Sequence, residues 1–243
     1  MGRAGVSAKS CGDTHRSRHD SRLQTSVLAL IRGDFSFCRN TVQNIIYCID
    51  MDTSDEIQKW KTYQVRTENN KPRPLLVEAL KYVQDKNIAL DLGAGALNDT
   101  EYLLKSGFKE VTAVDITKQF REITIPAKSK LLYIQTRFNE YEFPSDYFNI
   151  ISAQYALPFL KKEDFKKVWT HIRDALKTGG IFTGQFFGTR DDWFEKSEMV
   201  FHSQNEVSEL VREFDIIKQE EREYTEQDER KKHWHYFDLI LRK

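Results

Sequence analysis

The chain lacks the features that mark several special classes of protein. Its three cysteines all lie in residues 1–50, so no disulfide framework holds the rest together. No run of about 18 apolar residues occurs, so no membrane-spanning helix is predicted. Lys plus Arg and Asp plus Glu number 37 each, and this balance argues against a nucleic acid or a membrane surface as partner. We expect a globular protein that depends on its hydrophobic core, with the reducing cytoplasm as the default compartment.

Residues 1–50 differ in composition from residues 51–243, which hold every proline and tryptophan. Their first half is small, polar and basic, which is typical of disorder. A targeting peptide is an alternative, although Asp13 and Asp20 count against one. We expect a poorly ordered N-terminal extension followed by one folded domain, with Met51 as its natural start. A metal site would need four side chains whose spacing matches no zinc pattern, namely Cys11, His15, His19 and Cys38.

Residues 88–117 are the most informative stretch. A short apolar run ends in Asp91 and predicts a buried parallel strand. Gly93 and Gly95, separated by Ala94, then form a turn with almost no side-chain bulk, against which a ligand can lie. A helix over residues 101–106, with Asn98, Asp99 and Thr100 as possible caps, leads to a second strand that ends in Asp115. This order predicts the first half of a nucleotide-binding βαβ unit.

The spacing of the acids narrows the choice of ligand. Asp115 follows Gly95 by twenty residues, where an acid at the end of the second strand can accept both ribose hydroxyls. The third glycine of a dinucleotide fingerprint is replaced by Asn98, which weakens the case for NAD. Asp91 stands two residues before the first glycine, where it suits a cation better than a phosphate.

The acid-x-glycine-x-glycine pattern resembles the first motif of the class I S-adenosylmethionine-dependent methyltransferases. This resemblance covers roughly residues 60–243 and, within the family, is to small methyltransferases of the TehB type. It implies S-adenosylmethionine as cofactor. The cofactor-binding positions that it implies are Asp91, Gly93, Ala94, Gly95, Asp115, Ile116, Phe138, Gln154 and Arg73.

The remaining pattern predicts an α/β fold. Apolar runs at residues 131–135, 149–153 and 181–187 predict further strands, and residues 214–222 and 234–241 predict a closing pair. Helices are expected from Pro74, over residues 163–177, and after a capping box at Ser203–Glu206. The expected fold is a Rossmann-like, doubly wound, mostly parallel sheet of seven strands, of which the last two form an antiparallel hairpin.

One departure from the family concerns how adenine is recognised. Relatives commonly place an acid just after the third strand, where it accepts a hydrogen bond from the adenine amino group. Here residues 135–140 read Gln-Thr-Arg-Phe-Asn-Glu, and that acid is missing. Phe138 offers an apolar face for the base, and a backbone group could read the amino group.

The acceptor side is expected after the fourth strand, where Gln154 and Tyr155 stand. Tyr155 and His202 are the candidate catalytic residues, needed only if the acceptor arrives protonated. No metal is expected, since His233 and His235 lack a third ligand of matching type. A small-molecule acceptor is the default, with no nucleic-acid or membrane partner, and the oligomeric state is undefined. Two alternatives stay open: an NAD(P)-dependent oxidoreductase, and a non-catalytic scaffold that binds the cofactor.

Overall fold

The computed structural model of the protein describes residues 55–195 and 198–243. The expected boundary between residues 50 and 51, and the segment that contains the three cysteines, lie outside the described residues. Among the described helices, none combines the length and apolar character needed to cross a membrane.

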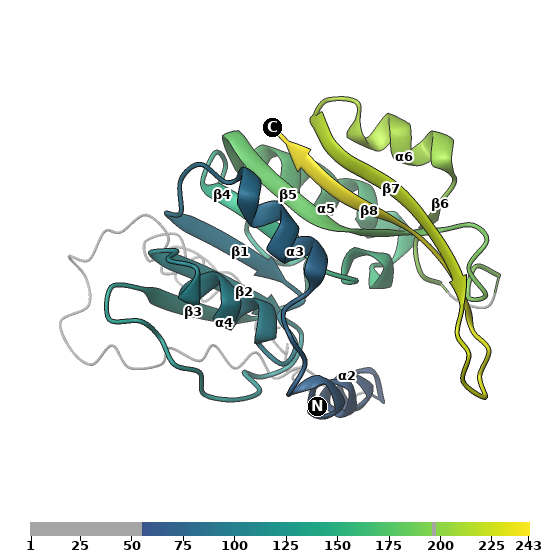
Figure 1. The fold of residues 1–243 in the computed structure, drawn as a ribbon, viewed down its shortest axis with the longest axis horizontal. Helices are drawn as coiled ribbons and strands as arrows, with labels where there is room; N and C mark the ends of the chain where they lie inside the picture. Colours follow the sequence, from purple (N-terminus) through teal and green to yellow (C-terminus); the bar gives the residue numbers. More distant parts are fainter. Residues whose placement is uncertain (1–54, 196–197) are drawn as a thin grey trace, which may run out of the picture. The chain divides into compact units, whose positions relative to one another are not determined.

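The fold is organised around a single sheet with the strand order β3-β2-β1-β4-β5-β8-β7 (Figure 1). The first five strands are parallel, and β8 runs antiparallel to both β5 and β7. This confirms the predicted doubly wound sheet with its C-terminal hairpin. The strands are β1 (Ile88–Leu92), β2 (Glu110–Asp115), β3 (Lys130–Gln135), β4 (Phe148–Ala153), β5 (Leu176–Gly188), β6 (Phe201–His202), β7 (Asp215–Thr225) and β8 (His233–Arg242).

The strand count differs from the prediction by the short strand β6. It spans two residues and pairs in parallel with Phe187 and Gly188 at the end of β5. Two residues are too few to show an alternating pattern, so the sequence carries no signal for this strand. The hairpin strand β7 is also longer than expected, because its polar residues continue the ladder with β8 as far as Thr225.

Helices cover both faces of the sheet, and apolar residues determine which face each helix covers. Helices α3 and α4 pack with Ala89 and Val111 of the sheet, whereas α5 and α6 pack with Leu90 and Leu92. Because successive strand residues point to opposite faces, these pairs define two layers of core; Figure 1 shows α3 and α5 on opposite sides of the sheet. The helices are α2 (Asp55–Thr67), α3 (Pro74–Ala79), α4 (Asn98–Lys105), α5 (Lys162–Ala175) and α6 (Gln204–Val211).

One predicted helix cap is confirmed and another is corrected. Ser203 and Glu206 form the expected capping box at the start of α6, and Gly107, with φ of +97°, follows the end of α4. The residue that caps α4 is Leu97, in a left-handed conformation and without a side-chain cap. Asp99 therefore does not cap the helix; its carboxylate accepts a hydrogen bond from the Arg73 backbone instead.

Candidate functional site

The turn after β1 places bare backbone at the carboxyl edge of the sheet. Gly93 and Gly95 have φ of +79° and +49°, a region that favours glycine. The amides of Gly93 and Ala94 both donate to the carbonyl of Val114, at 2.8 and 3.2 Å, which ties the turn to β2. A Cβ on Gly93 would lie 2.7 Å from that of Ala156 and 3.5 Å from the Phe138 ring. The turn is thus tightly enclosed at Gly93, and only glycine fits there.

Asp115, at the end of β2, is held beside this turn. Its carboxylate accepts hydrogen bonds from the Gly95 amide at 2.8 Å and from the amide and hydroxyl of Thr117 at 2.9 and 2.7 Å. The side chain is buried, and burial raises its pKa. The structure therefore brings together Asp115 and the glycine turn, as the twenty-residue spacing predicts.

Two further carboxyl groups stand at the same turn, those of the buried Asp91 and the half-buried Asp99. Asp91 accepts a hydrogen bond from the Thr100 hydroxyl at 2.5 Å, and Asp99 accepts one from the Arg73 amide at 2.7 Å. Burial, assisted by the nearby charges of Asp99 and Asp115, raises the pKa of Asp91 to about 8. Burial also raises the pKa of Asp99. A group of buried and half-buried acids with raised pKa values favours a ligand that brings positive charge and hydroxyl donors, as the expected cofactor does.

Helix α2 lies over the glycine turn. Gln64 is buried, and its Nε2 donates to the Gly95 carbonyl at 3.1 Å and to the Thr117 hydroxyl at 2.5 Å. An ion pair of 2.8 Å joins Glu56 at the start of α2 to Arg137 beyond β3. Sequence reasoning did not predict α2 as a helix, because Gln64 is one of the few residues it buries and no apolar stripe marks it.

Arg73 reaches both the cofactor edge and the expected acceptor side. Its guanidinium donates to the Tyr63 hydroxyl at 3.0 Å and lies 5.1 Å from the centre of the Tyr155 ring. Its backbone amide is the group that binds Asp99. Arg73 is thus placed where it can meet an anionic group of a ligand beside the buried acids.

Tyr155 occupies the expected position just beyond β4, with a backbone φ of 53°. Non-glycine residues held in this region are often found at functional sites. Its amide donates to Gln185 Oε1 at 2.9 Å, and its ring centre lies 6.3 Å from that of Phe187 and 5.6 Å from that of Tyr236. Gln154 turns inward, donating to the Thr183 carbonyl at 3.3 Å.

The structure does not bring His202 to this side of the sheet. The ring centre of His202 lies 4.6 Å from that of Phe165 and 5.2 Å from that of Phe186. Tyr155 instead lies against Phe187, the residue that follows Phe186 in β5. Adjacent strand residues point to opposite faces, so His202 and Tyr155 are on different faces of the sheet. Burial lowers the pKa of His202 to about 4. The geometry therefore favours a core position over a catalytic one.

We expect the buried His202 to make the fold sensitive to acid. Its folded pKa of about 4 lies below the ordinary value of 6.5, so the unfolded chain binds more protons between these values. Stability is full above pH 6.5 and declines by about 3 kcal/mol as the pH falls to 4. Urea unfolding of His202→Phe at several pH values should show a shallower acid decline, and an unchanged slope would contradict this assignment. The half-buried His171 provides the control, as His171→Phe.

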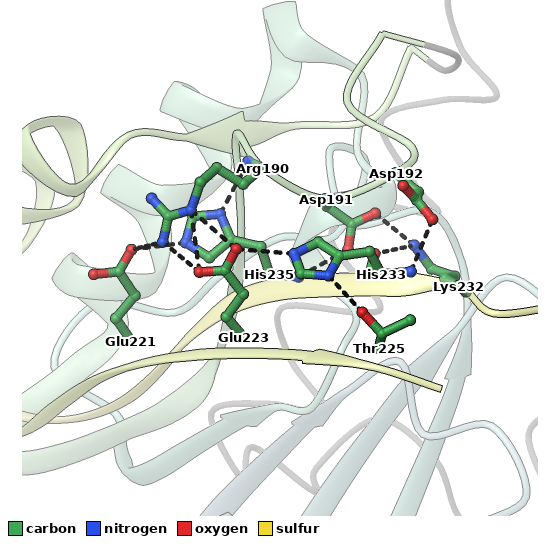
Figure 2. Close-up of polar contacts among 9 residues, drawn as sticks. All are labelled: Arg190, Asp191, Asp192, Glu221, Glu223, Thr225, Lys232, His233 and His235. Atoms are coloured by element: carbon green, nitrogen blue, oxygen red, sulfur yellow. Dashed lines mark hydrogen bonds and ion pairs between the residues drawn. The ribbon is translucent and has the colours of Figure 1, made fainter. Parts of the chain in front are cut away.

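A network of polar side chains ties the segment after β5 to the hairpin of β7 and β8 (Figure 2). The Arg190 amide donates to His235 Nδ1 at 3.0 Å, so the ring's Nε2 carries the proton that bonds Glu221 at 2.8 Å. The Arg190 guanidinium forms ion pairs with Glu221 and Glu223, both in β7. The backbone of Asp192 pairs with that of His233.

At the centre of this network lies a buried ion pair between Lys232 and Asp191, at 2.5 Å. The lysine ammonium sits 3.9 Å from the Trp193 ring centre and 4.1 Å from that of Trp234. Asp191 also accepts from the amide of His235 at 3.2 Å. The sequence signal for this pairing is weak, because its members lie about forty residues apart.

His233 and His235 are occupied by these contacts. Their Nε2 atoms face Glu223 and Glu221, at 2.9 and 2.8 Å. Within residues 55–195 and 198–243, no group of three or more His, Cys, Asp or Glu side chains has the arrangement of a metal site.

Comparison with known protein families gives a match for the central part of the chain. Residues 90–183 match the model of a family described as a methyltransferase domain. This match begins in β1 and ends in β5, so it includes the glycine turn, Asp115 and Tyr155. No curated protein matches the chain.

Several solved structures share the fold. The 1,6-didemethyltoxoflavin-N1-methyltransferase of Burkholderia thailandensis, solved with 1,6-didemethyltoxoflavin and S-adenosylhomocysteine, has a TM-score of 0.54 and 17% identity, covering 84% of this chain and 98% of its own. TehB from Haemophilus influenzae has a TM-score of 0.62 and 17% identity, covering 76% and 67%. A putative methyltransferase of Haloferax volcanii, in complex with the activator Trm112, has a TM-score of 0.59 and 16% identity, covering 79% and 97%.

These structural likenesses establish the shared fold, and the family match covers the segment that carries the glycine turn and its acids. Residues 90–183 are thus a methyltransferase domain, in a chain that shares the fold of S-adenosylmethionine-dependent methyltransferases.

Proposed function

We propose that the protein methylates a small, uncharged acceptor that contains an aromatic ring. The observation that carries this proposal is the group of aromatic side chains around Tyr155, at the carboxyl ends of β4 and β5. Ligands of open α/β sheets bind at this edge. We also expect the enzyme in the reducing cytoplasm, because no cysteine occurs after residue 50.

In this proposal the cofactor lies along the glycine turn and contacts the acids beside it. Asp115 accepts the ribose hydroxyls, the glycine turn with Ala94 lies against the cofactor, and Ile116 and Phe138 offer apolar contacts. Asp91 and Asp99 face the ammonium group, and Arg73 meets the carboxylate. The cofactor supplies a methyl group on a positively charged sulfur; the protein supplies alignment and a dry surface.

The acceptor surface is continuous with the methionine end of that cofactor. Arg73 lies over Tyr155, so the ring of Tyr155 stands beside the expected methyl group. Phe187 is buried behind this ring, and its ring centre lies 5.9 Å from that of Trp234 and 6.1 Å from that of Phe159. Aromatic rings of this kind stack well on a planar ligand.

The charges beside these rings are paired within the protein, which favours an uncharged acceptor. Asp238 accepts hydrogen bonds from Gln185 at 3.0 Å and from Arg222 at 3.0 Å. Lys232 is paired with Asp191. A charged acceptor would lose its hydration without gaining a partner from either pair.

The chemistry of Tyr155 limits the atom that is methylated. Burial and the neighbouring hydroxyl of Tyr236 raise the pKa of Tyr155, so its phenol keeps its proton at neutral pH. Tyr155 can donate a hydrogen bond but is a poor general base. This supports an acceptor atom that already has a free lone pair, such as a ring nitrogen. The Burkholderia thailandensis enzyme of similar fold, named as an N1-methyltransferase, was solved with bound 1,6-didemethyltoxoflavin.

The test is a transfer assay with S-adenosylmethionine labelled on its methyl group. A cell extract is separated into its dialysable small-molecule fraction and its retained macromolecules, and each is incubated with the protein. Label in an aromatic product of the small-molecule fraction is expected. Label that appears only in protein or nucleic acid would overturn the proposed acceptor class, and turnover on any acceptor would exclude a non-catalytic scaffold. Asp115→Ala serves as the low-activity control.

We also expect cofactor binding to release a proton at neutral pH. The Asp91 carboxyl is largely protonated below its pKa of about 8, and a cationic ligand favours its ionised form. Up to about one proton should therefore leave on binding at pH 7. Calorimetry in two buffers of different ionisation enthalpy measures this number. Asp91→Asn should abolish the release, and equal release from both proteins would exclude Asp91 as the source.

A further inference from the structure

The backbone of Tyr155 has a conformation that is unfavourable for a residue with a Cβ. Its φ of 53° lies in the left-handed region, which such residues keep only where the surrounding structure holds them. The amide of Tyr155 donates a hydrogen bond to Oε1 of Gln185, on the neighbouring strand β5, at 2.9 Å. Gln185 is 2% exposed, so this contact is made away from solvent. Gln185 therefore helps to hold the backbone where the expected acceptor surface begins.

The amide of Gln185 has a fixed orientation, because its nitrogen has partners of its own. Gln185 pairs with Asp238 in the register of β5 and β8, and its Nε2 donates to Asp238 Oδ1 at 3.0 Å. The same nitrogen donates to Gln154 Oε1 at 3.3 Å. A carboxylate can only accept hydrogen bonds, so Asp238 binds the amide nitrogen and leaves Oε1 for the amide of Tyr155.

Asp238 is held in turn by Arg222, on the edge strand β7. Arg222 Nε donates to Asp238 Oδ2 at 3.0 Å, and the Arg222 side chain is 43% exposed. This chain of hydrogen bonds thus starts at solvent, crosses β7, β8 and β5, and ends just beyond β4. Apolar side chains in place of Gln185 and Asp238 would pack the sheet without burying polar groups, but they could not bind the amide of Tyr155.

We propose that Gln185, oriented by Asp238, is a positioning residue for methyl transfer. The backbone conformation of Tyr155 sets the direction of its Cα–Cβ bond, and in the left-handed form its ring centre lies 5.1 Å from Arg73 Cζ. Without the oxygen of Gln185, the amide loses its buried partner and the backbone relaxes to a negative φ, which turns the ring away. This inference rests on the proposed function, because that function places the ring of Tyr155 beside the acceptor.

The experiment measures transfer of the labelled methyl group to the small-molecule fraction, whose concentration is raised until the rate is maximal. Gln185→Leu removes the hydrogen-bond acceptor and should lower the maximal rate by about tenfold to a hundredfold, the scale of a misplaced group at a reacting centre. Calorimetric titration with S-adenosylhomocysteine should give an affinity within about twofold of wild type, because the hydrogen bonds of Gln185 are not made to the glycine turn or to Asp115. The loss should thus fall on transfer and not on cofactor binding.

Gln185→Glu gives a readout that a merely structural role would not move. The new carboxyl group can still accept from the amide of Tyr155, but when ionised it repels Asp238. At lower pH two adjacent carboxyl groups share a proton, so a hydroxyl can donate to Asp238 while the other oxygen accepts from Tyr155. The rate of this variant relative to wild type should therefore rise as the pH falls from about 8 to about 6, while Arg222 stays charged.

The matched controls are Gln227→Leu and Gln227→Glu, the same chemical changes at an exposed glutamine in the hairpin turn. Both should transfer the methyl group at the wild-type rate at every pH. The relative rate of Gln185→Leu should not depend on pH, because leucine has no group that titrates.

A wild-type rate in Gln185→Leu would overturn the role of Gln185, and so would a relative rate of Gln185→Glu that does not change with pH. If Gln185→Leu does not fold, the pH profile of Gln185→Glu decides alone. Absence of label from the small-molecule fraction with the wild-type protein would instead contradict the proposed function.

Discussion

Asp191→Asn is expected to lower the free energy of unfolding by about 3–5 kcal/mol, the usual cost of removing one partner of a buried ion pair. The substitution leaves the Lys232 ammonium, whose side chain is 10% exposed, facing a neutral amide. The rings of Trp193 and Trp234 compensate only in part, since each such contact contributes about 1–2 kcal/mol. Urea unfolding of the variant and the wild-type protein measures the difference.

The double variant Asp191→Asn/Lys232→Met shows whether the loss comes from the isolated charge. Replacing a whole buried pair by uncharged groups is often neutral, so the double variant should recover part of the stability lost in Asp191→Asn. Lys231→Met, at the neighbouring exposed lysine, is the control and should change stability by less than about 0.5 kcal/mol. Losses that simply add in the double variant would show that the pair is not coupled.

The ion pair of Lys232 and Asp191 also supports the proposed acceptor surface. Trp193 and Trp234 contact the ammonium of Lys232 from the segment after β5 and from β8, and both rings also lie near Phe187, at 6.4 and 5.9 Å. The pair thus joins two segments that each contribute an aromatic ring to the proposed acceptor surface. Variants at Asp191 should for this reason weaken acceptor use more than cofactor binding.

Most of the fold could be predicted because its signals are local. A short apolar run bounded by glycine predicts β1, and the capping box at Ser203 predicts the start of α6. The missed elements have no such signal. Helix α2 directs the polar side chain of Gln64 at the site, and a polar inward face has no apolar periodicity.

The candidate site was predictable where one segment contains all its parts. The glycine turn and Asp115 fall within a single βαβ unit, and the structure joins them by a 2.8 Å hydrogen bond. Gln64 could not be identified in this way, because it lies 31 residues before Gly95, to which its side chain donates, in a helix without an apolar stripe. His202 shows the opposite case, since a histidine beside a helix cap gives no indication of the face on which it lies.

Asp115→Ala is expected to weaken binding of S-adenosylhomocysteine by about tenfold to a hundredfold, or 1.5–3 kcal/mol, the range for hydrogen bonds to a charged group. The variant loses the acceptor for the ribose hydroxyls and also releases the Gly95 amide, which Asp115 holds at 2.8 Å. Asp115→Asn separates these effects, because one amide oxygen can still accept from Gly95 while the charge is gone. Calorimetric titration should therefore rank the wild-type protein first, Asp115→Asn second and Asp115→Ala last. An unchanged affinity in Asp115→Ala would remove Asp115 from the cofactor site.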